Sequence, residues 1–488
     1  MSPRIFRIAA LLSTALATTP AMADTLRDAL AAAYETNPTL TGAREGQKTI
    51  DEGVPIAKSR GRPNAGASVT YTEFFPRNGG SGTSTSPDRV LNIGPSVSVP
   101  LYSGGAVKNS VKAAQNRVEG GFASLRGTES AIFSAVVAAY MDVIRDESIV
   151  DLNRANVGVL QVNLEATRDR FEIGDVTRTD VAQSEARLAT ATSSLETARA
   201  NLIRSKEVYI QLVGREPGQL EAPPPLPNLP AGPDDAVDVA LDNNPDLISA
   251  RENREAAQYD RKAANAARLP TIAGVGGVTY SNNFGSIDLT IPYDHSATDA
   301  TVGVRATIPL YQGGAPAAQI RQSQARLGQA QEQEIAAERD VVAQTRASYA
   351  SWRASQEVIT SSERAVSANE LSLEGVRAEN SVGNRTILDI LNAEQELLSS
   401  KVQLVAARRN AYVAGFTLLA AMGKAEARDL GLDGGPLYDP VAEYDRVKGK
   451  WNDWDSQPDP KVTATRTVDT PPQKADIEPL PDYTGRKK

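Results

Sequence analysis

The chain carries the same series of structural signals twice. Asn37-Pro38 recurs as Asn244-Pro245 about 207 residues later, and the segment PLYSGG at 100–105 recurs as PLYQGG at 309–314. Four further pairs keep this spacing to within about two residues: Tyr140 with Tyr349, Gly174 with Gly383, Asp180 with Asp389, and Gly214 with Gly423. A repeat of this length fixes the architecture before any single motif does. We predict two tandem structural units, at 24–215 and 234–433, rather than separate enzyme domains.

The first 23 residues have the features of a secretory signal peptide. Arg4 and Arg7 precede a short apolar run, and Ala21-Met22-Ala23 supplies small residues for cleavage. The apolar run is too short to span a bilayer, and no later run reaches the ~18 uninterrupted apolar residues of a membrane helix. We expect an exported chain that begins at Asp24 and has no helical anchor.

The composition narrows the classes of function. The chain has no cysteine, which excludes a disulfide framework, a thiolate metal site and a lipid-bearing cysteine. A net charge of −8 makes nucleic-acid binding a poor fit for an exported protein. No catalytic set is visible, and the single histidine, His295, lies in a polar loop. We therefore predict neither an enzyme nor a cofactor.

Each unit reads as a short helix, two strands, a long helix, a tight turn and a returning helix. The first helix is expected from Thr25 to about Arg60, where Gly61-Arg62-Pro63 ends it. The predicted strands are 66–75, 89–102, 271–284 and 297–311, and the predicted long helices are 106–172 and 315–381. The proline-rich segment 216–233 is predicted to be a linker, and the polar tail 434–488 to be largely disordered, above all from Thr463.

The second strand of each pair alternates strictly between apolar and polar residues. Val302, Val304 and Ala306, for example, alternate with Gly303 and Arg305. A period of two with one apolar face indicates a strand with different media on its two sides. This pattern fits a strand of a membrane barrel, with aromatic residues at its ends, and also a half-buried strand of a soluble sandwich.

The returning helices carry a seven-residue apolar repeat. It runs through Val181, Leu188, Leu195, Leu202 and Tyr209 in the first unit, and a matching row begins at Ile390 in the second. Such a repeat over at least four heptads predicts helices that coil around their neighbours. Each returning helix covers about half of its 67-residue partner, so a returning helix and an opening helix stacked end to end would match one long rod. We predict four helical columns and four strands per chain.

Four strands with a lipid-facing side cannot close a barrel, because about eight is the practical minimum. An open sheet edge is not stable in lipid. A trimer would supply twelve strands and twelve helical columns, which could enclose a conduit on the order of 25 Å wide.

These features together resemble the TolC family of outer-membrane efflux and type I secretion channels. The resemblance rests on the paired strand exits at 100–105 and 309–314, the turns FEIGDVTRTDV and NSVGNRTILDILNAEQELL, and the opening ALAAAYETNPTL. It covers about residues 24–455. It implies a homotrimer with a twelve-stranded β-barrel in the Gram-negative outer membrane, continued by a coiled-coil helical barrel through the periplasm. It also implies a periplasmic adaptor and an inner-membrane pump of the RND or ABC type.

The resemblance assigns roles to the turns between the helices. Asp389 would ring the channel constriction, and the second ring position falls on the uncharged Asn392. Arg385 corresponds to the gate arginine, with Thr179 and Asp180 as its partners. The tyrosine expected to meet Asp180 is replaced by Asn380.

Both aspartates also fit a purely structural role, because Thr177 and Thr386 each stand three residues earlier, as in a capping box. The turns at Gly174 and Gly383 would face the adaptor, and Gly104, Gly105, Gly313 and Gly314 would form the strand-to-helix turns. The alternatives are a soluble periplasmic coiled-coil scaffold or adaptor, which needs no alternating strands, and an exported hydrolase, which lacks a nucleophile and base here.

Overall fold

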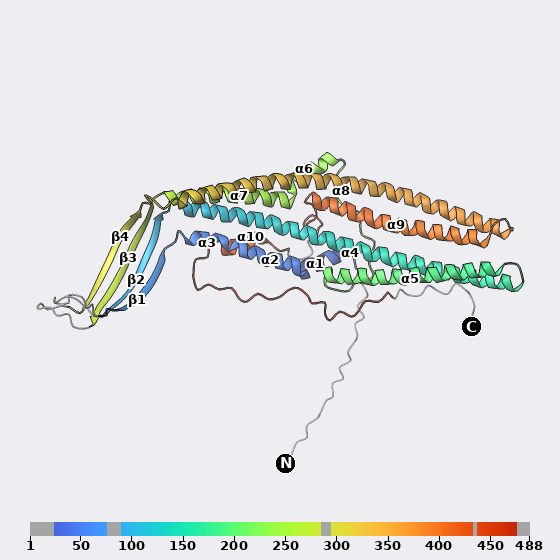
Figure 1. The fold of residues 1–488 in the computed structure, drawn as a ribbon, viewed down its shortest axis with the longest axis horizontal. Coiled ribbons are helices and arrows are strands. Elements are labelled where there is room, and N and C mark those ends of the chain that lie inside the picture. The colour runs from blue at the N-terminus through green and yellow to red at the C-terminus, as the bar shows by residue number, and fades with distance from the viewer. Residues whose placement is uncertain (1–23, 76–88, 285–293, 433–436, 476–488) are drawn as a thin grey trace, which may run out of the picture.

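The computed structural model of the protein describes residues 24–75, 89–284, 294–432 and 437–475. The predicted signal peptide and most of the loop within each strand pair lie outside these residues. The described chain is an elongated body with a sheet at one end and two long helical hairpins that turn at the other (Figure 1).

The elements follow the same order in both units. The first unit contains α1 (Leu26–Thr36), α2 (Pro38–Asp51), α3 (Gly53–Ser59), β1 (Asn64–Glu73), β2 (Arg89–Tyr102), α4 (Ala106–Glu172) and α5 (Arg178–Val213). The second contains α6 (Pro233–Asn243), α7 (Pro245–Asn265), a 3-10 turn (Ala266–Arg268), β3 (Thr271–Phe284), β4 (Ser296–Thr307), α8 (Ala315–Ser381) and α9 (Ile387–Ala421). A short helix, α10 (Pro440–Val447), follows.

The prediction of one continuous opening helix from Thr25 to about Arg60 was wrong, because three helices occupy this range. The residue before a proline is disfavoured in the helical region, so the chain breaks at Asn37 and at its counterpart Asn244. Each Asn side chain accepts hydrogen bonds from the two backbone N–H groups of the next helical turn. Each also donates to the end of the returning helix, Asn37 to the Leu212 carbonyl and Asn244 to the Ala421 carbonyl, both at 2.9 Å. The repeated Asn-Pro pair thus joins the break between the opening helices of each unit to the end of its returning helix.

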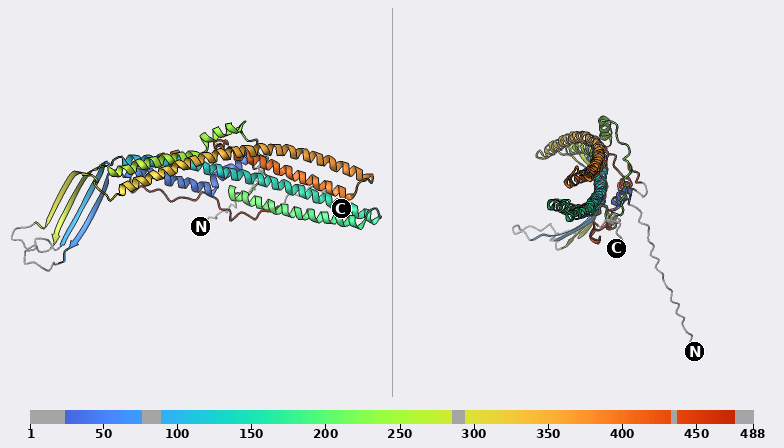
Figure 2. Two further views of the ribbon diagram at one scale, coloured as in Figure 1. Left: turned by 45° about the horizontal axis from the view of Figure 1, so that its top comes forward. Right: turned by 90° about the vertical axis from the view of Figure 1, so that its right-hand side faces the viewer.

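The helices form four columns side by side. Along α4, α5 covers one half and the α1–α3 series covers the other, while α9 and α7 divide α8 in the same way. Both α7 and α9 also contact α4. The first column is therefore α1–α3 stacked with α5, the second is α4, the third is α7 stacked with α9, and the fourth is α8. Viewed down the long axis, the columns describe an arc, with α1 and α2 on its convex side (Figure 2). This arrangement agrees with the four columns predicted from helix lengths.

The main core lies at mid-height, where the two units meet. Phe133 and Tyr140 on α4, Leu202 and Tyr209 on α5, and Phe416 on α9 are fully buried there. The Tyr140 hydroxyl donates to the carbonyls of Asp24 at 2.9 Å and Glu221 at 2.7 Å. The core therefore fixes Asp24 against the segment that joins the two units.

Among the described helices, α4 alone has a window apolar enough, by length and composition, to cross a membrane. The mean hydropathy of this window is 1.2, and 44% of it is buried inside the chain. Because α4 supplies many of the residues of the mid-height core, its apolar character is that of a core helix.

The four strands form one antiparallel sheet in the order β1-β2-β3-β4. Since paired residues lie on the same face, the register gathers most of the large apolar residues of the four strands on one face: Val69, Tyr71, Leu91, Ile93, Val97, Val278, Tyr280, Val302 and Val304. The other face carries mainly serine, threonine, asparagine, glycine and charged residues. Neither face is covered by another element of the described chain, and Val302 is 95% exposed.

Two strand boundaries differ from the predicted ones. β4 ends at Thr307 rather than Tyr311, because its partner β3 begins at Thr271, opposite Thr307. β1 lies two residues earlier than predicted, at Asn64–Glu73, because it pairs from Ser98 back to Arg89 of β2. The other two strands and both long helices have the predicted limits.

The start of the polar tail is ordered against the helices. Tyr444 of α10 packs edge-on against Phe122 of α4. Beyond α10 the chain runs along the helices away from the sheet (Figure 1). The Thr465 hydroxyl donates to the Gly214 carbonyl, and the backbone N–H of Gln473 donates to Glu207 Oε1. Over residues 463–475 these contacts replace the disorder expected from composition, while 476–488 lie outside the described residues.

We expect Tyr140→Phe to lower the free energy of unfolding by about 1–2 kcal/mol, because the carbonyls of Asp24 and Glu221 lose the hydroxyl of the buried Tyr140 as their shared donor. The matched control is Tyr349→Phe, whose hydroxyl donates to one carbonyl, that of Ala231, in an exposed setting. Guanidinium unfolding of the purified proteins in detergent, followed by circular dichroism, measures both. Equal shifts for the two variants would contradict this role of Tyr140.

Candidate gate at the turns of the helical hairpins

The two hairpin turns are built in the same way. Gly174 and Gly383 have φ values of +81° and +82°, in the left-handed region that favours glycine. The N–H of Asp175 reaches back to the Arg170 carbonyl at 2.9 Å, and that of Asn384 to the Glu379 carbonyl at 3.0 Å. These bonds satisfy carbonyls that the ends of α4 and α8 would otherwise leave unpaired.

A complete capping box begins each returning helix. Thr177 and Asp180 exchange side-chain and backbone hydrogen bonds at the start of α5, and Thr386 and Asp389 do so at the start of α9. Two hydrogen bonds from the threonine lower the pKa of Asp180 and of Asp389. The bond from the threonine hydroxyl has the larger effect, and the bond from the threonine backbone N–H has the second largest. Both carboxylates are therefore ionised at neutral pH.

Within one chain, Arg385 is not joined to Thr179 or Asp180. Its Nε donates to Glu379 Oε2 at 2.7 Å, across the turn of its own hairpin. This bond, together with the charges of Glu379 and Asp389, raises the pKa of Arg385. Asn380 donates to the Arg385 carbonyl at 2.7 Å and so also stabilises this turn. The roles of these residues as gate links stay a prediction.

Polar contacts join the two hairpins above the turns. Arg187 on α5 donates to Asn392 Oδ1 on α9 at 2.7 Å, so Asn392 is held by the first unit. The carboxylate of Glu394 on α9 accepts hydrogen bonds from Asn163 on α4 at 3.1 Å and from Arg377 on α8 at 2.9 Å. Its side chain is only 5% exposed, which makes both donors necessary. A small apolar cluster of Leu160, Ala191 and Leu391 lies beside these contacts.

Sequence reasoning missed Glu394. It lies three residues after Leu391 and four before Leu398, and therefore on the apolar face of α9. A carboxylate within that row is the signal that could have identified it.

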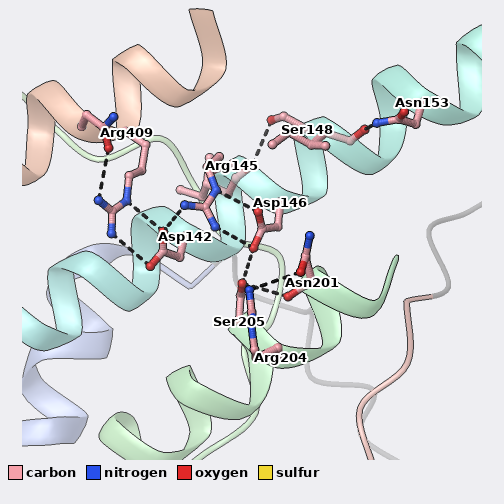
Figure 3. Close-up of polar contacts among 12 residues, drawn as sticks. Asp142, Arg145, Asp146, Ser148, Asn153, Asn201, Arg204, Ser205 and Arg409 are labelled. Atoms are coloured by element: carbon pink, nitrogen blue, oxygen red, sulfur yellow. Dashed lines mark hydrogen bonds and ion pairs between the residues drawn. The ribbon is translucent and has the colours of Figure 1, made fainter. Parts of the chain in front are cut away.

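A second polar network joins the hairpins at mid-height (Figure 3). Arg409 on α9 forms two hydrogen bonds with Asp142 on α4, at 2.8 and 3.0 Å. Arg145 bonds both Asp142 and Asp146, and Ser205 on α5 donates to Asp146. Three helices from both units are thus connected through five side chains. The network lies at the level of the main core, where it holds α9 against α4.

The strand-to-helix turns also repeat. Gly104 and Gly105 have φ values of +60° and +84°, and Gly313 and Gly314 have values of +60° and +82°. A side chain at Gly104 would meet Leu269 at 2.8 Å, so this turn needs glycine for its conformation and also for its space. The turns redirect the chain from the sheet into α4 and α8.

The comparisons with known proteins identify the family. The model of the family described as "Outer membrane efflux protein" matches residues 29–215 and 236–424, which are the two units. The chain belongs to this family. It is 34% identical over 438 residues to the outer membrane efflux protein BepC of Brucella suis, covering 90% of this chain and 93% of that protein. It is also 26% identical over 314 residues to the outer membrane protein TolC of Escherichia coli, covering 62% and 64% of the two chains.

Solved structures of outer-membrane channels share the fold. VceC of Vibrio cholerae aligns with a TM-score of 0.70 at 22% identity over 82% of this chain and 96% of that one. CmeC of Campylobacter jejuni aligns with a TM-score of 0.72 at 13% identity over 87% and 89%. The predicted resemblance is confirmed, and the protein is an outer membrane efflux protein.

We expect the starts of α5 and α9 to fray in acid. The capping boxes are complete above the usual carboxyl pKa of 3.8 and are lost as the pH falls through the lowered pKa of Asp180 and Asp389. Hydrogen exchange of peptides covering 175–185 and 384–394, corrected for intrinsic rates, should show less protection at a pH well below the usual carboxyl pKa of 3.8 than at neutral pH. In the control variant Asp389→Asn, the change at 384–394 should disappear, whereas that at 175–185 should remain. Equal protection of the native protein at both pH values would contradict the capping role.

Proposed function

We propose that three copies of this chain form a passive outer-membrane exit duct. The observation that carries this proposal is the sheet, which has one apolar face, one polar face and no element covering either. Such a sheet suits lipid on one side and water on the other. Its strands of 10–14 residues reach ~30–45 Å, enough to cross a bilayer when tilted.

The edges of the sheet require other copies. β1 and β4 each have one partner within the chain, and an unpaired edge is unstable in lipid. Pairing β4 of one copy with β1 of the next would close twelve strands from three copies. The helical arc would continue this ring, because its four columns would likewise become twelve. At ~1.5 Å per residue, the 67-residue helices would extend the duct by about 100 Å.

In this assembly the hairpin turns form the far end of the duct and its constriction. Asp389 and Asn392 lie on the first two turns of α9, and the Asp389 carboxylate would place one negative charge per copy around the opening. Cations are favoured at such a ring. Arg385, Thr179, Asp180 and Asn380 lie around the same turns, and contacts of Arg385 with Thr179 and Asp180 would have to form between copies or in another state of the gate.

The duct needs partners that supply energy and substrate. The turns at Gly174 and Gly383 are the exposed ends of both hairpins, so a periplasmic adaptor would dock there and link the duct to an inner-membrane pump. BepC is named an efflux protein, and AprF of Pseudomonas aeruginosa, 27% identical over 314 residues, an alkaline protease secretion protein. The same duct could serve either use, with the pump choosing the cargo.

The alternatives account for less of the structure. A soluble periplasmic scaffold would need only the helices and would leave the uncovered apolar face of the sheet unexplained. The family is one of efflux proteins rather than enzymes, and we propose that this chain performs no reaction and binds no cofactor or nucleic acid.

We expect protein extracted from outer membranes in detergent to have three times the mass of the mature chain. Light scattering combined with size-exclusion chromatography measures this mass after correction for detergent. A monomer in the soluble periplasmic fraction would contradict the duct and favour the scaffold.

We expect Asp389→Asn to reduce cation selectivity in planar bilayers several-fold, because a ring of three charges is lost. Thr386→Ala is the matched control, since it removes the threonine of the same capping box and keeps the Asp389 carboxylate. Asn392→Asp should increase selectivity. Equal effects of Asp389→Asn and Thr386→Ala would show that the cap matters rather than a ring at Asp389.

A further inference from the structure

Two of the three tryptophans lie on an exposed turn after α10 that no proposed role explains. Trp451 is 80% exposed and Trp454 is 91% exposed. The turn is nevertheless well defined, because the Trp454 N–H donates to Asn452 Oδ1 at 3.1 Å and Lys450 pairs with Asp455 at 3.0 Å. Large aromatic side chains held in water on an ordered turn mark an interaction surface.

Hydrogen bonds fix this turn at the level where the sheet begins. Lys58 donates to the Lys448 carbonyl at 2.8 Å, and Arg62 donates to the Lys450 carbonyl at 2.7 Å. Arg62 precedes the first residue of β1, Asn64, by two positions. An open hollow of about 840 Å³ separates the turn from this end of the sheet, and Trp451, the 62% exposed Ile56 and Asn64 all contribute to its walls.

This level is the rim at which the proposed barrel meets the periplasm. Tyr102 and Tyr311 are exposed near the same ends of β2 and β4, as are Leu101 and Leu310. The tryptophan turn lies at the same end of the sheet as these exposed side chains, beside β1. It follows α10, which packs against α2 on the convex side of the helical arc, the side that faces away from the duct (Figure 2).

We propose that Trp451 and Trp454 insert into the headgroup region of the periplasmic phospholipid leaflet and anchor the rim of the duct. Tryptophan favours this depth because its ring is apolar and its indole N–H still finds a polar partner. Arg62 and Lys450 line the hollow together with Trp451, and Asp453 and Asp455 line it as well. The tryptophan rings, rather than a net positive charge, therefore carry the proposed anchor. The inference rests on the proposed barrel, which sets the height of the membrane. It gives the tail, which the duct itself does not require, a role in holding the protein at a fixed depth in the membrane.

Fluorescence of the whole protein in vesicles tests this anchor. Trp352→Phe leaves only the two tail tryptophans, while the double variant Trp451→Phe, Trp454→Phe leaves only Trp352, which packs against Tyr349 on α8 with ring centres 5.8 Å apart. The vesicles consist of phosphatidylethanolamine and phosphatidylglycerol, with or without bromine near the carbonyl end of the acyl chains.

We expect brominated lipid to lower the fluorescence of Trp352→Phe about twofold, and to leave that of the double variant unchanged, because only interfacial rings lie within reach of the bromine. Flotation of the vesicles in a density gradient reports barrel insertion separately. If Trp352→Phe floats with the vesicles but is quenched by aqueous acrylamide and not by bromine, the anchor is refuted and the barrel stands. If neither variant floats, the barrel fails, and the anchor with it.

Discussion

The structure depends on a sheet that the chain cannot complete. Four antiparallel strands present one apolar face to the outside of the molecule and leave β1 and β4 each with an unpaired edge. In water, exposure of the apolar face is unfavourable. In lipid, exposure of the unpaired N–H and C=O groups along the two edges is unfavourable. Closure with further copies would remove both problems, and the proposed assembly rests on this constraint.

The helical part of the chain is a single layer of long helices side by side. Each 67-residue helix is too long to be covered by a single partner, and two shorter segments share it. The junctions between these segments lie near mid-height, where the repeated Asn-Pro cap, the Tyr140 hydrogen bonds and the aromatic core occur together. Stability is concentrated there, while the sheet and the hairpin turns extend away from it.

The contacts between hairpins change in character along the wall. At mid-height a network centred on Asp142, Arg145 and Arg409 joins α4 to α9. Nearer the turns, hydrogen bonds to Glu394 and Asn392 join α9 to its neighbouring helices. The turns themselves are stabilised within each hairpin, by glycine and capping boxes. Each hairpin can therefore keep its shape if its neighbour moves, which is what a gate at this end requires.

The sequence by itself determined the repeat, the limits of both long helices, the capping boxes and the alternating strands, because these depend on local rules of period, glycine and proline. It also located Asp389 and Arg385 at a turn, but could not say what they contact. The pairing of Arg409 with Asp142 spans 267 positions and is set by how far one hairpin is displaced along the other, which only the packed structure decides. The same holds for Glu394, whose two donors come from α4 and α8. It also holds for the tryptophan turn, because the side chains of Lys58 and Arg62 in the first unit donate to its backbone carbonyls and place it beside β1. Local physics specified the elements, and long-range packing specified their neighbours.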